Sequence, residues 1–149
     1  MTDLRFLFDE NLIALGRSLK NFYPTEISIC GDVAVPQAAA DDPDIYPWCQ
    51  RNNAVLVTYD WNMLRDERVL QSLIANEGIR VLWIDQVRGE PSQKAFTRIV
   101  GRWDKVRAAI LRQDGASGFV LRGSNQLVAY TSIGDTVAEV VRRRRTRLT

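Results

Sequence analysis

The chain of 149 residues contains no histidine. Imidazole is the usual side chain that titrates near neutral pH, so a serine–histidine triad, a histidine-paired ribonuclease mechanism and a histidine-ligated zinc site are excluded. Only two cysteines are present, Cys30 and Cys49, and they form no CxxC pair. We therefore expect no disulfide framework and no zinc knuckle, and predict two ordinary half-buried thiols. Any chemistry must use carboxylates, hydroxyls, lysines, arginines or a hard metal.

Long uncharged apolar runs are also missing, and the first five residues carry no basic-then-apolar leader. We expect a cytoplasmic protein with no membrane partner. Hydrophobic residues make up 46% of the chain, enough for one self-sufficient core. The composition predicts a single domain over residues 1–149, in which residues 118–149 form a C-terminal β-hairpin and a basic tail.

The small net charge of +2 is unevenly distributed. The last eight residues contain five of the twenty basic side chains, which leaves fifteen basic against eighteen acidic residues in the body. A run of arginines binds phosphates by releasing their counterions, but it is equally typical of a solvated chain end. Both interpretations stay open.

Hydrophobic periodicity predicts alternating strands and helices. We expect strands at residues 5–8, 27–30, 54–58 and 79–84, each followed by a helix, and a hairpin with strands at 118–121 and 126–131. This order predicts an α/β fold, a three-layer α/β/α sandwich with a mainly parallel central sheet. In detail we expect Phe22 on the inner face of the first helix, Ser92 as the cap of the longest helix, Trp103 in its packed stripe, and Asp135 as the cap of a last short helix.

Two of the apolar strand segments run directly into acidic residues. Residues 5–8 are followed by Asp9, and residues 54–57 lead into Thr58 and Asp60. The carboxyl ends of parallel strands share one edge of the sheet, so these acids are expected to converge there. A divalent cation relieves their mutual repulsion, and oxygen ligands suit Mg²⁺ or Mn²⁺. The competing interpretation is that Asp60, and likewise Asp42 before Pro43, only caps a helix, a contribution of about 1 kcal/mol.

Three segments in this order, FLFDENL at 6–12, DPDI at 42–45 and LVTYD at 56–60, resemble the PIN-like nuclease superfamily. The similarity is greatest to its compact branch, which carries FLLDENL and TRDxDF motifs, and it covers about the first 85 residues. It implies a metal-dependent endoribonuclease that hydrolyses RNA phosphodiester bonds to 5′-phosphate and 3′-hydroxyl ends. It further implies the toxin component of a VapC-type toxin–antitoxin pair, with an antitoxin protein and a second copy as possible partners and Trp48 or Trp61 as interface candidates.

The resemblance assigns roles residue by residue. The catalytic acids are Asp9, Asp42 and Asp60, and the same three with Asp44 are the metal ligands. Supporting roles fall to Glu10, Asn11, Thr58 and Asn62. Asn62 stands where the family often has an acid, so a second Mg²⁺ or Mn²⁺ is expected to bind more weakly. Weaker candidates are Glu10 and Asp85 as further acids, and as RNA-binding side chains Lys20, Arg65, Arg68, Arg142, Arg143, Arg144 and Arg145.

Two other functions stay open. A PIN-like module with a depleted metal site would only bind RNA or a protein. A phosphoryl-accepting receiver domain also places acids after its first and third strands, but it needs a serine or threonine after the next strand and a lysine after the last. Residues 81–85 and the predicted hairpin provide neither.

Overall fold

The computed structural model describes residues 4–32, 35, 45–59, 67–75, 79–85, 87, 89–113, 115–136, 138, 139 and 142. Six strands form one sheet: β1 (Arg5–Phe8), β2 (Ile27–Ile29), β3 (Ala54–Thr58), β4 (Arg80–Ile84), β5 (Gly118–Leu121) and β6 (Leu127–Tyr130). Their order is β2-β1-β3-β4-β5-β6. The first five are parallel, and β6 pairs with β5 in the antiparallel direction. The predicted α/β class and the mainly parallel sheet are confirmed.

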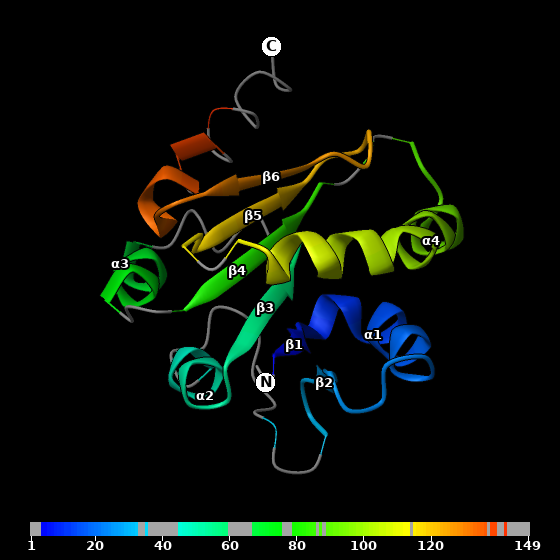
Figure 1. Ribbon diagram of the computed structural model, residues 1–149, viewed down its shortest axis with the longest axis horizontal. Coiled ribbons are helices and arrows are strands. Elements are labelled where there is room, and N and C mark those ends of the chain that lie inside the picture. The colour runs from blue at the N-terminus through cyan, green and yellow to red at the C-terminus, as the bar shows by residue number, and fades with distance from the viewer. Residues whose placement is uncertain are drawn as a thin grey trace.

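Helices lie on both faces of this sheet (Figure 1). Successive strand residues point to opposite faces, so Phe6 and Phe8 belong to one core cluster while Leu7 belongs to the other. Helices α1 (Ile13–Lys20) and α4 (Ser92–Leu111) cover the first cluster, and α2 (Ile45–Arg51) and α3 (Glu67–Ala75) cover the second. Strands covered on both faces need apolar side chains throughout, which explains their nearly continuous hydrophobic sequences.

The long helix α4 packs through Trp103, which is fully buried. Its ring centroid lies 5.0 Å from that of Phe6 in an edge-on arrangement and 5.4 Å from that of Phe8. The predicted packing role of Trp103 is confirmed. On the polar side of α4, Arg107 donates two hydrogen bonds of 2.5 Å to the carboxylate oxygens of Glu26. Glu26 lies just before β2, so this ion pair connects α4 with the start of that strand.

Three details of the sequence prediction were wrong. Helix α1 ends at Lys20, so Phe22 lies beyond its last turn and is 71% exposed. The N-cap of α4 is Pro91, whose extended backbone (φ −62°, ψ 145°) leaves Ser92 as the first helical residue. Near the C-terminus the hydroxyl of Ser132 accepts a hydrogen bond from the backbone N–H of Asp135, so Ser132 performs the capping role predicted for Asp135.

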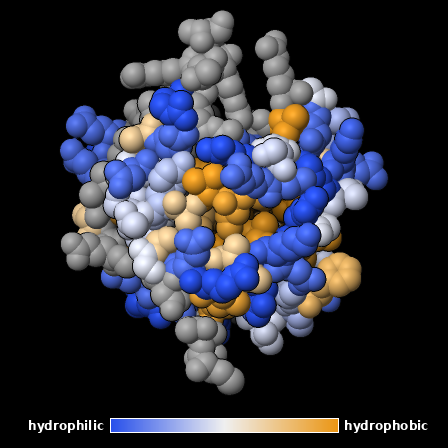
Figure 2. Space-filling model, turned by 45° about the horizontal axis from the view of Figure 1, so that its top comes forward, coloured by the Kyte–Doolittle hydropathy of each residue, from blue (hydrophilic) through white to orange (hydrophobic). Residues whose placement is uncertain are grey.

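The surface beside α4 and β6 carries a hydrophobic area bordered by hydrophilic residues (Figure 2). Half-buried residues of both elements pack against the first core cluster, namely Phe96, Val100, Leu127 and Ala129. Within the described ranges no helix combines the length and the apolarity needed to cross a membrane.

Candidate functional site

Buried polar side chains are concentrated at one edge of the sheet. Among the described residues, four polar or charged side chains are buried, and three of them, Asp9, Thr58 and Asp85, follow or end the neighbouring strands β1, β3 and β4. The fourth, Thr136, lies near the C-terminus. Burying a charged side chain costs free energy unless it is paired, so an accumulation at the carboxyl ends of the strands indicates a functional site.

The carboxylate of Asp9 is held in place from two sides. Its Oδ1 accepts a hydrogen bond of 2.8 Å from the backbone N–H of Glu10, and its Oδ2 accepts one of 2.8 Å from the hydroxyl of Thr58. The backbone N–H of Asp9 donates to the carbonyl of Val57 at 3.0 Å, which continues the pairing of β1 with β3. Asp9 is also the N-cap of the short 3-10 helix η1 (Glu10–Leu12).

The alternation of side chains explains why these groups meet. Leu7 and Leu56 point into the cluster beneath α2 and α3. Two residues further along their strands, Asp9 and Thr58 lie on the same face by the same two-residue period. Asp85 follows Trp83 of that cluster by two residues and is on the same face. Three neighbouring strand ends therefore present polar groups on one side of the sheet.

The strand order has its switch point between β1 and β3. Helix α1, which follows β1, covers one face of the sheet, and α3, which follows β3, covers the other. In an open α/β sheet such a change of face between two neighbouring strands is where ligands bind. Asp9 and Thr58 lie on the two strands that flank the change.

Cys30 lies at the end of β2, close to this site. Burial, together with the negative charges of Asp9 and Glu10, raises the pKa of its thiol to about 12. Burial also raises the pKa of Cys49 to about 12. Both cysteines are free, as predicted, but they are fully buried where half-buried thiols were expected, and both thiols stay protonated at neutral pH.

The donor atoms at the site suit a hard cation. The Oδ1 of Asn11 is buried and accepts no hydrogen bond from the described residues, so it is available as a neutral oxygen ligand beside Asp9. In the part of the chain that the structure describes, no group of three or more acidic, histidine or cysteine side chains is placed to hold a metal.

The remaining predicted residues divide into two groups. Nine lie outside the described residues: Asp42, Asp44, Asp60, Trp61, Asn62, Arg65, Arg143, Arg144 and Arg145. The others are described but lie elsewhere or on the surface. Glu10 is exposed next to Asp9, Arg68 is exposed in the first turn of α3, and Lys20 forms an ion pair of 3.8 Å with Asp32. Trp48, a predicted interface residue, packs half-buried against the second core cluster.

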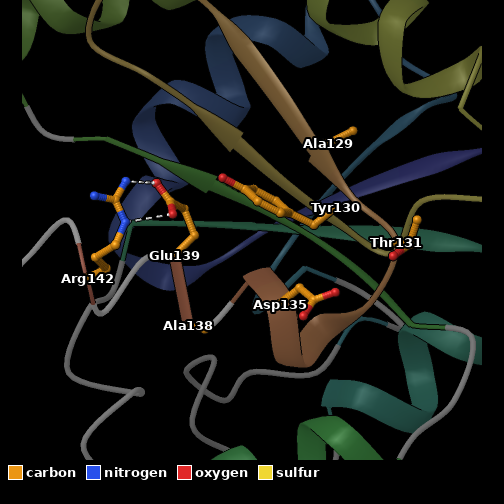
Figure 3. A pocket seen from close by; sticks show the side chains of 7 residues that line it. All are labelled: Ala129, Tyr130, Thr131, Asp135, Ala138, Glu139 and Arg142. Atoms are coloured by element: carbon orange, nitrogen blue, oxygen red, sulfur yellow. Dashed lines mark hydrogen bonds and ion pairs between the residues drawn. The ribbon is translucent and has the colours of Figure 1, made fainter.

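Arg142 lies next to the end of β6, a strand that is far from β1 and Asp9 in the strand order. It lines an open pocket of about 510 Å³ between the end of β6 and the C-terminal segment (Figure 3). Its guanidinium binds Glu139 in a bidentate ion pair, with nitrogen–oxygen distances of 3.0 and 2.5 Å. Strands β3, β4 and β5 separate β6 from β1, so this pocket is not part of the Asp9 site.

The sequence prediction gave Asp85 less weight than its burial justifies. The available signal was the same as for Asp9, an apolar strand that ends at an acidic residue. Asp85 is 1% exposed, and its backbone N–H donates to the carbonyl of Leu121 at 2.8 Å, which fixes it at the edge of the sheet.

Comparison with models of known protein families, with curated proteins and with solved structures finds no match to this chain.

Proposed function

We propose that this chain is a metal-dependent endoribonuclease that hydrolyses RNA phosphodiester bonds, built as a PIN-like three-layer α/β/α sandwich with a C-terminal hairpin. The observation that carries the proposal is the convergence of Asp9, Thr58 and Asp85 at the carboxyl ends of three neighbouring strands, where the fold changes face. The resemblance of the strand-end motifs to PIN-like nucleases supports the same site. We further propose that it acts in the cytoplasm as the toxin of a toxin–antitoxin pair.

The residues have distinct roles in this proposal. Asp9, with Asp60 two residues beyond Thr58 in the sequence, holds Mg²⁺ or Mn²⁺, while Thr58 and the N–H of Glu10 orient the Asp9 carboxylate. A bound divalent cation supplies an activated water near neutral pH and neutralises charge on the cleaved phosphodiester. Asp42 and Asp44 come shortly before α2, which packs on the same face as Asp9, and we assign them to the same ligand set.

Asp85 lies further from that cation than Asp9 does in this proposal. Neighbouring strands lie about 4.8 Å apart, so β1 and β4, with β3 between them, are separated by roughly 10 Å. We therefore assign Asp85 to a second cation or to a water bound by the first.

The decisive experiment compares cleavage of a 5′-labelled unstructured RNA with and without Mg²⁺ or Mn²⁺. Wild-type protein should cleave only with the metal. Asp9→Asn and Asp60→Asn should each lose at least about a hundredfold in rate, because removing one charge from a metal site costs several kcal/mol. Asp135→Asn is the matched control, since Asp135 is exposed beside the pocket at β6.

Titration of Mn²⁺ by calorimetry provides a readout that is independent of activity. Wild-type and Asp135→Asn proteins should bind Mn²⁺, and Asp9→Asn should bind it at least about tenfold more weakly. Wild-type cleavage rates in Asp9→Asn would show that the site is wrongly assigned. If the protein binds RNA but neither binds Mn²⁺ nor cleaves the RNA, the nuclease assignment is wrong and the protein is a binding module.

The strand order favours one second candidate. The order 2-1-3-4-5 of the parallel strands is shared by phosphoryl-accepting receiver domains. Such domains need a hydroxyl residue after the fourth strand and a lysine after the fifth, whereas this chain has Asp85 and Arg122 there. Incubation with acetyl phosphate separates the two functions, because only a receiver would acquire an acid-labile phosphoryl group that Asp60→Asn removes.

A further inference from the structure

An arginine follows the next strand along the edge of the sheet that carries the candidate site. Strand β5 runs parallel to β4, and Leu121 lies opposite Ile84 in the register, so Arg122 follows β5 beside Asp85. The backbone N–H of Arg122 donates to the carbonyl of Gln126 at 2.9 Å, which extends the pairing of β5 with β6 by one residue. Arg122 therefore keeps the strand geometry, and its side chain follows the alternation of β5.

The side chain of Arg122 lies on the same face of the sheet as the candidate site. Val120 belongs to the second core cluster, and Arg122 follows it by the two-residue period that also places Asp85 on this face. The ion pair of Arg122 with Glu139 agrees, because the C-terminal segment packs on the same cluster through Ile133. The row of polar strand ends from β1 to β5 thus covers three strand spacings, about 14 Å.

The guanidinium of Arg122 makes only long contacts with its neighbours. Its Nη1 lies 3.5 Å from the Oε1 of Gln126, and its Nη2 lies 4.0 Å from the Oε1 of Glu139. Ordinary N–H···O hydrogen bonds measure about 2.7–3.2 Å. Its Nε is buried and donates to none of the described residues. An unsatisfied donor on a charged group costs free energy, and an anion with several oxygens supplies the missing acceptors.

The carboxylate of Glu139 is already bound by a second arginine. Arg142 contacts both of its oxygens, at 3.0 and 2.5 Å (Figure 3). One carboxylate between two guanidinium groups leaves one positive charge uncompensated among these three side chains, and the longer contact belongs to Arg122. Arg98 of α4, in contrast, has a carboxylate of its own, that of Glu90 at 3.1 Å. Arg122 therefore brings an available positive charge to the edge of the sheet.

We propose that Arg122 binds a phosphate of the RNA substrate next to the cleaved bond, an inference that rests on the proposed nuclease function. Phosphates of one strand follow each other about every 3.4 Å along a duplex axis, so a strand that crosses the polar row brings more than one phosphate to it. The cleaved phosphodiester lies at the cation near Asp9, and Arg122, three strands away, meets another one. The planar fork of N–H groups suits two phosphate oxygens at once.

This role makes RNA length a determinant of binding. A substrate that reaches from Asp9 to Arg122 gains the second phosphate contact, and a dinucleotide with a single phosphodiester does not. Arg122 lies beyond the first 85 residues, so the resemblance to PIN-like nucleases assigns it no role. The contact is made away from the reacting atoms, and Arg122 is therefore a positioning residue.

Steady-state cleavage separates positioning from chemistry. With an unstructured RNA oligonucleotide, Arg122→Gln should raise KM about tenfold and change kcat by less than about twofold, because the contact holds substrate and transition state equally. With a dinucleotide, Arg122→Gln and wild type should have the same kcat/KM. Arg112→Gln is the matched control. It also removes one positive charge, at the exposed C-cap residue of α4, and should equal wild type with both substrates.

RNA binding provides a second readout, measured by fluorescence anisotropy in the Asp9→Asn background so that the RNA stays intact. Adding Arg122→Gln should weaken binding about tenfold and reduce the slope of log K against log salt by about 0.7, the value for one phosphate contact on a single strand. Adding Arg122→Lys should preserve the slope, because the charge remains, and weaken binding by only about threefold through loss of the two-pronged contact. Without the Asp9 substitution, both Arg122 variants should bind Mn²⁺ as tightly as wild type.

The outcomes distinguish this proposal from the nuclease assignment. An unchanged KM for the oligonucleotide or an unchanged salt slope in Arg122→Gln would overturn the phosphate contact and leave the nuclease standing. An equal loss with the dinucleotide, or weaker Mn²⁺ binding in both Arg122 variants, would also overturn it, because Arg122 would then act in the metal site or the fold. If the wild-type protein binds RNA with the slope that depends on Arg122 but cleaves none, the nuclease assignment is wrong and the phosphate contact stands. Absence of RNA binding would overturn both.

Discussion

Replacement of Thr58 by valine tests the link that holds the candidate site together. The two side chains have nearly the same shape, so the substitution removes mainly the hydroxyl that donates to Asp9 at 2.8 Å. Both residues are fully buried. A hydrogen bond to a charged group contributes about 1.5–3 kcal/mol, so Thr58→Val should lower the free energy of unfolding by about 2 kcal/mol. For a chain of this length the melting temperature should fall by roughly 4–8 °C.

Thr136→Val is the matched control. Thr136 is equally buried, and its hydroxyl donates to the carbonyl of Ser132 at 2.8 Å, an uncharged acceptor. A hydrogen bond of that kind contributes about 1 kcal/mol. The difference between the two variants therefore isolates the charge of Asp9, and we expect Thr58→Val to cost about 1 kcal/mol more. Urea unfolding followed by tryptophan fluorescence measures both losses.

A double-mutant cycle with Asp9→Asn completes this test. Residues in direct contact commonly show interaction energies of about 0.5–3 kcal/mol, and we expect a value of about 1–2 kcal/mol here. Thr58→Val should also weaken Mn²⁺ binding, because the Asp9 carboxylate would lose one of the two donors that orient it. The reasoning is refuted if Thr58→Val is no more destabilising than Thr136→Val, or if the cycle with Asp9→Asn shows no interaction.

Three further predictions concern the rest of the fold. Arg107→Lys keeps the charge but loses the two-pronged contact with Glu26, and a double-mutant cycle with Glu26→Gln should give a coupling of about 0.5–1 kcal/mol. Gly118→Ala should lower the free energy of unfolding in urea by about 2 kcal/mol, because a Cβ atom at position 118 would overlap the side chain of Thr136. Burial raises the pKa of Cys30 and Cys49 to about 12. Above about pH 8.5 the unfolded chain therefore releases thiol protons that the native state retains, and the free energy of unfolding should fall with rising pH, less steeply in a variant with both cysteines replaced by alanine.

The strands and the longest helix were predictable because their signals are local. Apolar runs define β1, β3 and β4, and the spacing of buried residues around Trp103 defines α4. Helix ends were less predictable, since Phe22 continues the helical spacing but lies beyond the last turn of α1. Whether Pro91 or Ser92 caps α4 depends on the backbone angles of the connection before the helix, which the side-chain pattern does not specify.

The candidate site also has one part that the sequence predicted and one part that only the structure showed. The sequence indicated Asp9 and Thr58 separately, but their hydrogen bond joins residues 49 positions apart. The burial of Asp85, which follows β4 between β3 and β5, identified it as a candidate site residue, and this burial is visible only in the structure. Whether Asp42, Asp44 and Asp60 complete a metal site with Asp9 stays a prediction.

The sequence by itself determined the α/β class, the absence of histidine chemistry and the acidic residues that follow the apolar strands. These depend on residue type and short-range period, which are properties of neighbouring residues in the chain. Only the tertiary structure decided that β1 lies between β2 and β3, that Asp9 meets Thr58, and that β6 pairs with β5 at one end of the strand order. The pairing of strands is set by long-range burial and backbone hydrogen bonding, and the same local pattern is compatible with several strand orders.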